Sequence, residues 1–108
     1  MSDVDPNEPT GQESEFPLPP ASFSFLVLSM TMQVEYQLGL MRQGEEEKPE
    51  PNLPVARHTI DMMGVLLEKT KGNLTLDEQR LLENSLTELR FRFVQASDEA
   101  AKAETQKA

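Results

Sequence analysis

The sequence contains no cysteine, no tryptophan and a single histidine, His58, among its 108 residues. Without cysteine the chain has no disulfide, no cysteine-ligated zinc and no thiol nucleophile. Basic residues are also scarce: ten Lys and Arg stand against nineteen Asp and Glu, which gives a net charge of −9. This surplus of acid works against binding a phosphate backbone, because such binding needs Lys and Arg to neutralise the phosphates.

The length of the chain allows one small domain at most. Below about 80 ordered residues a single hydrophobic core is marginal, and such domains usually need a covalent staple, a metal or a partner. Since the sequence has no cysteine and therefore no disulfide, we expect contact with a partner to bury the additional apolar surface that a stable fold requires.

The acidity is concentrated outside the segments with apolar periodicity. Residues 1–20 contain five acids, no base and five of the eight prolines, a composition that predicts a disordered acidic tail. They lack the basic and apolar regions of a signal peptide, so we expect a cytoplasmic protein. Residues 44–52 are expected to form an acidic loop and residues 98–108 a frayed or disordered tail. The predicted helical domain spans residues 21–97, and its two parts on either side of the acidic loop, residues 21–43 and 52–97, each have no net charge.

End signals mark a helix over residues 53–71. Asn52 is a good N-cap, and Pro54 lies in the first turn, where its missing N–H is tolerated. Gly72 stands where a helix commonly ends in a left-handed glycine.

A second helix is predicted over residues 76–97. Thr75 and Glu78 have the spacing of a capping box, in which each side chain satisfies a free backbone N–H. The connection from the preceding helix is too short for anything but a helical hairpin or a tight corner. The residues expected to face the core of this hairpin are Leu53, Ala56, Ile60, Met63, Gly64, Leu67, Leu82, Leu86, Leu89, Phe93 and Ala96.

Residues 22–42 form the third and most apolar segment, with Glu35 as the only charge between Phe23 and Met41. Strict alternation of apolar and polar residues from Met30 to Leu40 is also typical of a strand. Helix is favoured because Met, Leu, Gln and Glu suit helices and no partner strand exists. The segment is too short and too interrupted by polar residues to cross a membrane.

As a helix, this first segment is apolar on two opposite sides, while the helix over 53–71 has an apolar arc of roughly 200°, wider than one core requires. The fold class is therefore all-α, a three-helix unit completed by oligomerisation, with a two-fold homodimer as the default. The alternative is that the Phe16–Pro20 segment folds back over the second apolar side. The candidate self-association surface comprises Phe25, Leu28, Met32, Tyr36, Phe91 and Val94.

The sequence contains no catalytic constellation, no metal-binding pattern and no phosphate-binding glycine loop. His58 has Asp61 one turn away, but it lies on the polar side of its helix and reads as an ordinary surface histidine. The tight connection between the last two helices resembles a helix-turn-helix, but Asp77 and Glu78 would face phosphate at the start of the second helix. We expect Arg80, Arg90 and Arg92 to be matched by Glu83 and Glu88, so no catalytic, cofactor-binding or metal residue is assigned.

Residues 52–94 resemble the small bacterial family catalogued as domain of unknown function 1844. The string Glu68–Thr75 is the most specific match, and Phe23–Met41, ending in Leu38 and Gly39, fits the first helix of the family. The other matching positions are Asn52, Leu53, Ala56, Ile60, Asp61, Leu81–Glu83 and Leu89–Phe93. Met62, Met63 and Gly64 depart from the leucines more common in members. The resemblance implies a soluble, all-helical bacterial domain with no assigned activity, cofactor or catalytic residue.

These features favour a non-enzymatic helical interaction or scaffold module that associates with copies of itself and can present its acidic segments to another protein. A small ligand-binding or catalytic protein with a site formed between subunits is the alternative. A weak nucleic-acid-binding helix-turn-helix is a second alternative.

Overall fold

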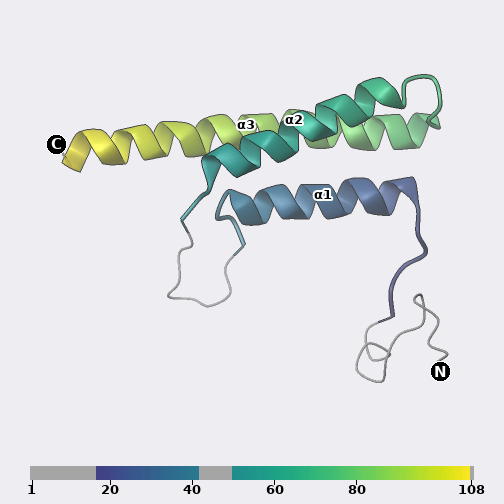
Figure 1. Cartoon of the computed structure of the whole chain (residues 1–108), viewed down its shortest axis with the longest axis horizontal. Helices are drawn as coiled ribbons and strands as arrows, with labels where there is room; N and C mark the ends of the chain where they lie inside the picture. The colour runs from purple at the N-terminus through teal and green to yellow at the C-terminus, as the bar shows by residue number, and fades with distance from the viewer. Residues whose placement is uncertain (1–16, 42–49, 108) are drawn as a thin grey trace.

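The computed structural model describes residues 17–41 and 50–107, which form three helices, α1 (Phe23–Gln37), α2 (Leu53–Lys69) and α3 (Leu76–Lys107). Each helix packs against both of the others, with α1 running beneath the α2–α3 pair in Figure 1. No strand occurs in the described part of the chain. The all-α prediction is confirmed, and the alternating segment is helical as far as Gln37, where α1 ends.

The core lies where the three helices meet. Val34, Met63 and Leu82 are fully enclosed, each from a different helix. The buried apolar residues are Val27, Val34, Leu38, Ala56, Ile60, Met63, Leu82, Leu86 and Leu89. Nearly all of them belong to the stripes that the helical periodicity predicts. One polar side chain, Thr59, is buried with them, and its hydroxyl donates to the Val55 carbonyl at 3.1 Å.

The predicted capping residues define both ends of the α2–α3 hairpin. The Val55 N–H donates to Asn52 Oδ1 at 3.3 Å. Between the helices, the Glu78 N–H donates to Thr75 Oγ1 at 3.1 Å and the Thr75 N–H donates to Glu78 Oε1 at 2.9 Å. These reciprocal bonds confirm the capping box. Gly72 has φ 81°, a left-handed conformation that glycine adopts without steric cost, and it turns the chain between α2 and α3.

The first helix ends earlier than predicted, at Gln37 rather than residue 42. Gly39 has φ 78° and its N–H donates to the Tyr36 carbonyl, while the Leu40 N–H reaches back to the Glu35 carbonyl at 2.9 Å. This pair of bonds is a Schellman motif, which satisfies the last carbonyls of a helix and stops it. The apolar pattern continues to Met41, but the glycine ends the helix first.

Gly39→Ala is expected to destabilise the protein by about 1–2 kcal/mol, since a Cβ in a left-handed conformation meets the following carbonyl. Chemical denaturation followed by circular dichroism measures this loss. The matched control is Ser29→Ala on the exposed side of α1, which should change stability by less than about 0.5 kcal/mol. Equal effects of the two substitutions would show that the turn at Gly39 does not hold α1 in place.

The third helix is longer than predicted. Residues 98–107 continue α3 instead of forming a frayed tail. No glycine follows Gly72 and no proline follows Pro54, so no residue interrupts the helix, and Ala, Glu, Lys and Gln have high helix propensity. In Figure 1 this last part, in yellow, projects beyond the ends of α1 and α2.

The described residues just before α1 do not cover its apolar side. Pro17 to Pro20 are exposed, with Leu18 83% exposed, so this part of the Phe16–Pro20 segment does not fold back onto the apolar side of α1. The rest of the predicted acidic tail, including Phe16, and most of the predicted acidic loop lie outside the described residues. None of the described helices combines the length and apolar character that crossing a membrane requires.

Candidate functional site

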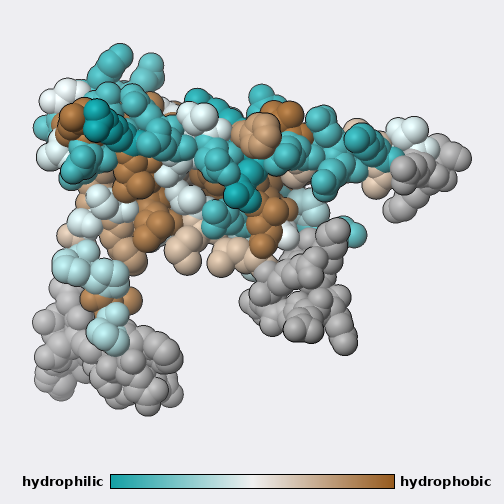
Figure 2. Space-filling view, turned by 180° about the vertical axis from the view of Figure 1, so that it is seen from behind, coloured by the Kyte–Doolittle hydropathy of each residue, from teal (hydrophilic) through white to brown (hydrophobic). Residues whose placement is uncertain are grey.

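One side of α1 exposes a row of large apolar residues. Leu28, Met32 and Tyr36 follow one another at four-residue spacing and are 49%, 46% and 59% exposed. Met32 lies two residues before buried Val34, which places it roughly 200° round the helix from the core. We call these three residues the α1 outer face. In Figure 2, apolar side chains gather along the lower edge of the molecule, which α1 forms.

The other three residues of the predicted self-association surface differ from this row in burial or in position. Phe25 lies on the same side of α1, one turn before Leu28, but is half-buried. Phe91 is 60% exposed and lies two residues after buried Leu89, on the side of α3 that points away from the bundle. Val94 lines a groove between α3 and α2. The six predicted residues are therefore divided between two helices, with Phe25, Leu28, Met32 and Tyr36 on α1 and Phe91 and Val94 on α3.

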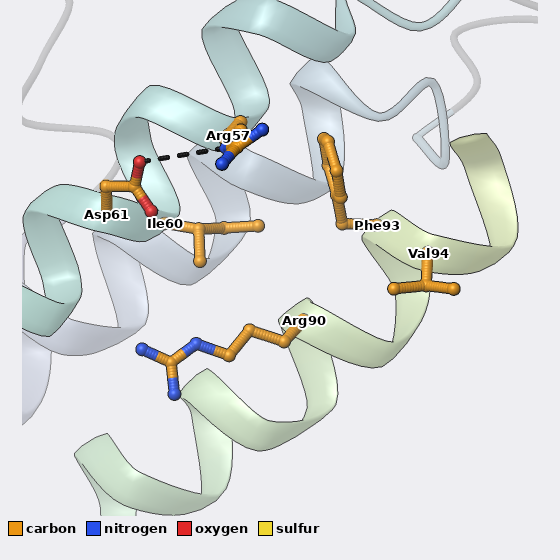
Figure 3. Close-up of a pocket in the computed structure, with 6 residues that line it drawn as sticks. All are labelled: Arg57, Ile60, Asp61, Arg90, Phe93 and Val94. Atoms are coloured by element: carbon orange, nitrogen blue, oxygen red, sulfur yellow. Dashed lines mark ion pairs between the residues drawn. The ribbon is translucent and has the colours of Figure 1, made fainter.

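The groove between α2 and α3 is the second exposed feature. It has a volume of about 230 Å³ and is lined by Arg57, Ile60, Asp61, Arg90, Phe93 and Val94. In Figure 3 these side chains ring an opening, with both arginines on its margin and Ile60 between them. Ile60 is buried and Phe93 is half-buried, so the floor is apolar.

Arg90 packs across the helix pair onto α2. Its Nη2 lies 3.3 Å from the position that a Cβ on Gly64 would occupy. Glycine within a helix costs about 1 kcal/mol relative to alanine, and here its missing side chain leaves room for a guanidinium group. A substitution at Gly64 would meet the end of the Arg90 side chain.

The arginines of the hairpin are less well matched than predicted. Arg92 Nε does bond Glu88 Oε2, at 2.7 Å, but Glu83 accepts from Gln79 Nε2 instead of an arginine. Among the described residues no carboxylate lies within 4.0 Å of the Arg90 guanidinium, and Arg57 reaches Asp61 only at 4.0 Å. The expected neutralisation of Arg90 is therefore wrong, because its side chain turns toward Gly64 on the neighbouring helix.

A family model described as Domain of unknown function (DUF1844) matches residues 20–95. The chain belongs to this family. The match spans α1, α2 and the part of α3 that packs in the bundle, so both the α1 outer face and the groove lie within the DUF1844 domain. No curated protein and no solved structure matches the chain.

The chemistry considered for His58 finds little support in the geometry of this DUF1844 member. His58 is exposed, and the carboxylate of Asp61 lies 4.0 Å from Arg57 Nε, as the dashed line in Figure 3 marks. Within the described ranges, no group of three His, Cys, Asp or Glu residues could hold a metal ion.

The sequence prediction missed the groove, the placement of Arg57 and Arg90 on its margin and the approach of Arg90 to Gly64. Arg57 and Arg90 lie 33 positions apart and line the same groove only because α2 and α3 pack side by side. One signal was present: a glycine in the middle of a strongly helical segment commonly has a packing reason.

Proposed function

We propose that the protein is a non-enzymatic interaction module that associates with a second copy of itself through the α1 outer face. What supports this is the row of Leu28, Met32 and Tyr36, three large apolar side chains at four-residue spacing with about half of each exposed. Single exposed apolar residues are ordinary, but a contiguous apolar patch on a small protein marks an interaction site. α1 is apolar on two opposite sides, and the core of the three helices buries only the side of Val27 and Val34.

A second copy suits this face because the face carries no charge. The chain has a net charge of −9, so two copies repel each other over most of their surfaces. The single charged residue of α1, Glu35, is half-buried and outside the row. Contact through the α1 outer face therefore brings the copies together where repulsion is least.

The spacing of the row also suits a copy of itself. Residues four apart form a ridge along a helix, and two such ridges interdigitate when helices cross at about −50°. Met32 is the middle residue of the row, so a two-fold axis beside it places Leu28 of one copy near Tyr36 of the other. A two-fold arrangement closes on itself and gives a dimer.

Sedimentation equilibrium of the full chain tests the proposal. The unmodified protein is expected to sediment above its monomer mass of 12.2 kDa at micromolar concentration. Met32→Glu places a charge at the centre of the row and should weaken dimerisation at least tenfold without unfolding the chain, since Met32 is 46% exposed.

The matched control is Val65→Glu, a change of the same charge at an exposed apolar residue of α2. This substitution should leave the dimerisation constant, and hence the apparent mass measured by sedimentation, unchanged. A single 12.2 kDa species for the unmodified protein, or equal weakening by both substitutions, would contradict self-association through the α1 outer face.

A further inference from the structure

We propose that the groove between α2 and α3 is a second binding site, which takes an acidic amphipathic segment of a partner protein. The juxtaposition that carries this is an apolar floor, Ile60 and Phe93, with two arginines on its margin, Arg57 and Arg90. The site is separate from the α1 outer face and does not depend on self-association.

The groove is large enough for one side chain of a partner protein but too small to enclose a whole small molecule. Pockets that enclose drug-sized ligands and cofactors occupy about 300–1,000 Å³, whereas this groove has about 230 Å³ and is open to solvent. One apolar side chain fits against Ile60 and Phe93. Val94, 55% exposed, extends the apolar wall outward along α3.

The two arginines on the margin of the groove carry more hydrogen-bond donors than the described carboxylates near them can accept from. A guanidinium group has five N–H donors in a planar fork, which matches a carboxylate with two parallel bonds. No described carboxylate lies within 4.0 Å of Arg90, and the Arg57–Asp61 contact of 4.0 Å involves side chains that are 73% and 68% exposed. By contrast, Arg92 is occupied by Glu88 at 2.7 Å.

Arg90 reaches across to α2 beside the groove. Its guanidinium lies over Gly64, with Nη2 3.3 Å from the position that a Cβ there would occupy. A side chain whose positions are limited by a neighbouring helix loses less conformational entropy on binding than a free one. Gly64 thus acts as a positioning residue for Arg90.

The charge of the groove decides the class of partner. Two arginines and one aspartate make it locally positive on a chain of net charge −9, so an acidic group is attracted here more than elsewhere on the molecule. Nucleic acid is disfavoured, since phosphate backbones require several Lys and Arg contacts and Asp61 adds repulsion. An acidic helix with leucine and glutamate one turn apart offers both the apolar side chain and the carboxylate.

Fluorescence anisotropy with a defined probe tests this site. The probe is an acetylated, amidated and labelled helical peptide carrying leucine and glutamate at i,i+4 spacing, and its twin carries glutamine in place of every glutamate. We expect the glutamate peptide to bind at least fivefold more tightly than its twin. Arg90→Gln should remove most of this difference, while Arg80→Gln, an exposed arginine of α3 outside the groove, should preserve it.

Gly64→Ala gives an independent readout, because it keeps every charge and adds one methyl group under the guanidinium. We expect it to weaken binding of the glutamate peptide at least twofold and to shift the Arg90 Nε–H resonance in ¹⁵N NMR spectra. Equal binding of both peptides, equal effects of Arg90→Gln and Arg80→Gln, or tighter binding of a short DNA duplex than of the glutamate peptide would overturn the proposal.

Discussion

Replacing Leu86 with alanine is expected to lower the free energy of unfolding by about 3–5 kcal/mol. Leu86 is 1% exposed and lies in the middle of the α3 stripe that faces the core. Removing a fully buried leucine side chain loses its transfer free energy and leaves a cavity that the surrounding helices fill only in part. Small domains have total stabilities of about 5–15 kcal/mol, so this single change removes a large share of the folded state.

Urea denaturation followed by circular dichroism measures this loss, with all variants at one protein concentration because dimerisation would stabilise the folded chain. Leu76→Ala is the matched control: the same change in the same helix, at a residue that is 62% exposed. It should cost less than about 0.5 kcal/mol. A loss below about 1.5 kcal/mol for Leu86→Ala with an unchanged denaturant slope would mean that α3 does not pack through this face.

Met32→Cys is expected to convert most of the protein to a disulfide-linked dimer under mild oxidation. The chain has no cysteine of its own, so the substitution creates a single reactive position. At a helix crossing the axes lie about 8–10 Å apart, and Cα atoms lie about 2.3 Å from each axis. Two residues facing each other at the crossing therefore have Cα atoms about 3.4–5.4 Å apart. The upper part of this range overlaps the roughly 4.4–6.8 Å that a disulfide spans.

Phe91→Cys is the control for this cross-link, since Phe91 is more exposed than Met32, 60% against 46%. Non-reducing gel electrophoresis should show a rapid cross-link at position 32 and a slow, concentration-dependent one at position 91. If position 91 forms the disulfide faster while sedimentation still reports a dimer, the copies meet through α3 and the crossing at Met32 is wrong. If neither position cross-links beyond random collision and sedimentation reports a monomer, self-association itself fails.

Features that depend on neighbouring residues in the chain were predictable from the sequence. The Asn52 cap and the Thr75–Glu78 capping box both form as expected, because the donors and acceptors are only three residues apart. The core stripe of α3 follows from helical periodicity alone. The exposure of Leu28, Met32 and Tyr36 was also predictable, since a helix that is apolar on two sides can present only one of them to a single core.

Two kinds of feature were not predictable in the same way. One depends on whether an apolar helical pattern or a helix-ending glycine prevails, and the other depends on how two helices pack together. The apolar pattern of α1 continues past Gly39, and only the backbone bonds to Tyr36 and Glu35 show that the glycine ends the helix. The groove forms between residues of two different helices, with Arg57 and Ile60 on α2 and Arg90 on α3, and periodicity within one helix carries no information about how two helices pack.

The unbroken length of α3 fixes the direction of its far end. Leu82, Leu86 and Leu89 hold one side of the helix against the core, and the same backbone continues without interruption to Lys107. The direction in which Lys102 points around the axis of α3 is therefore set by the positions of the buried leucines on the same helix. Inserting one residue between Leu89 and Lys102 would rotate everything beyond it by about 100° and move it by about 1.5 Å along the axis. The projecting end of α3 therefore has a fixed direction relative to the three-helix bundle.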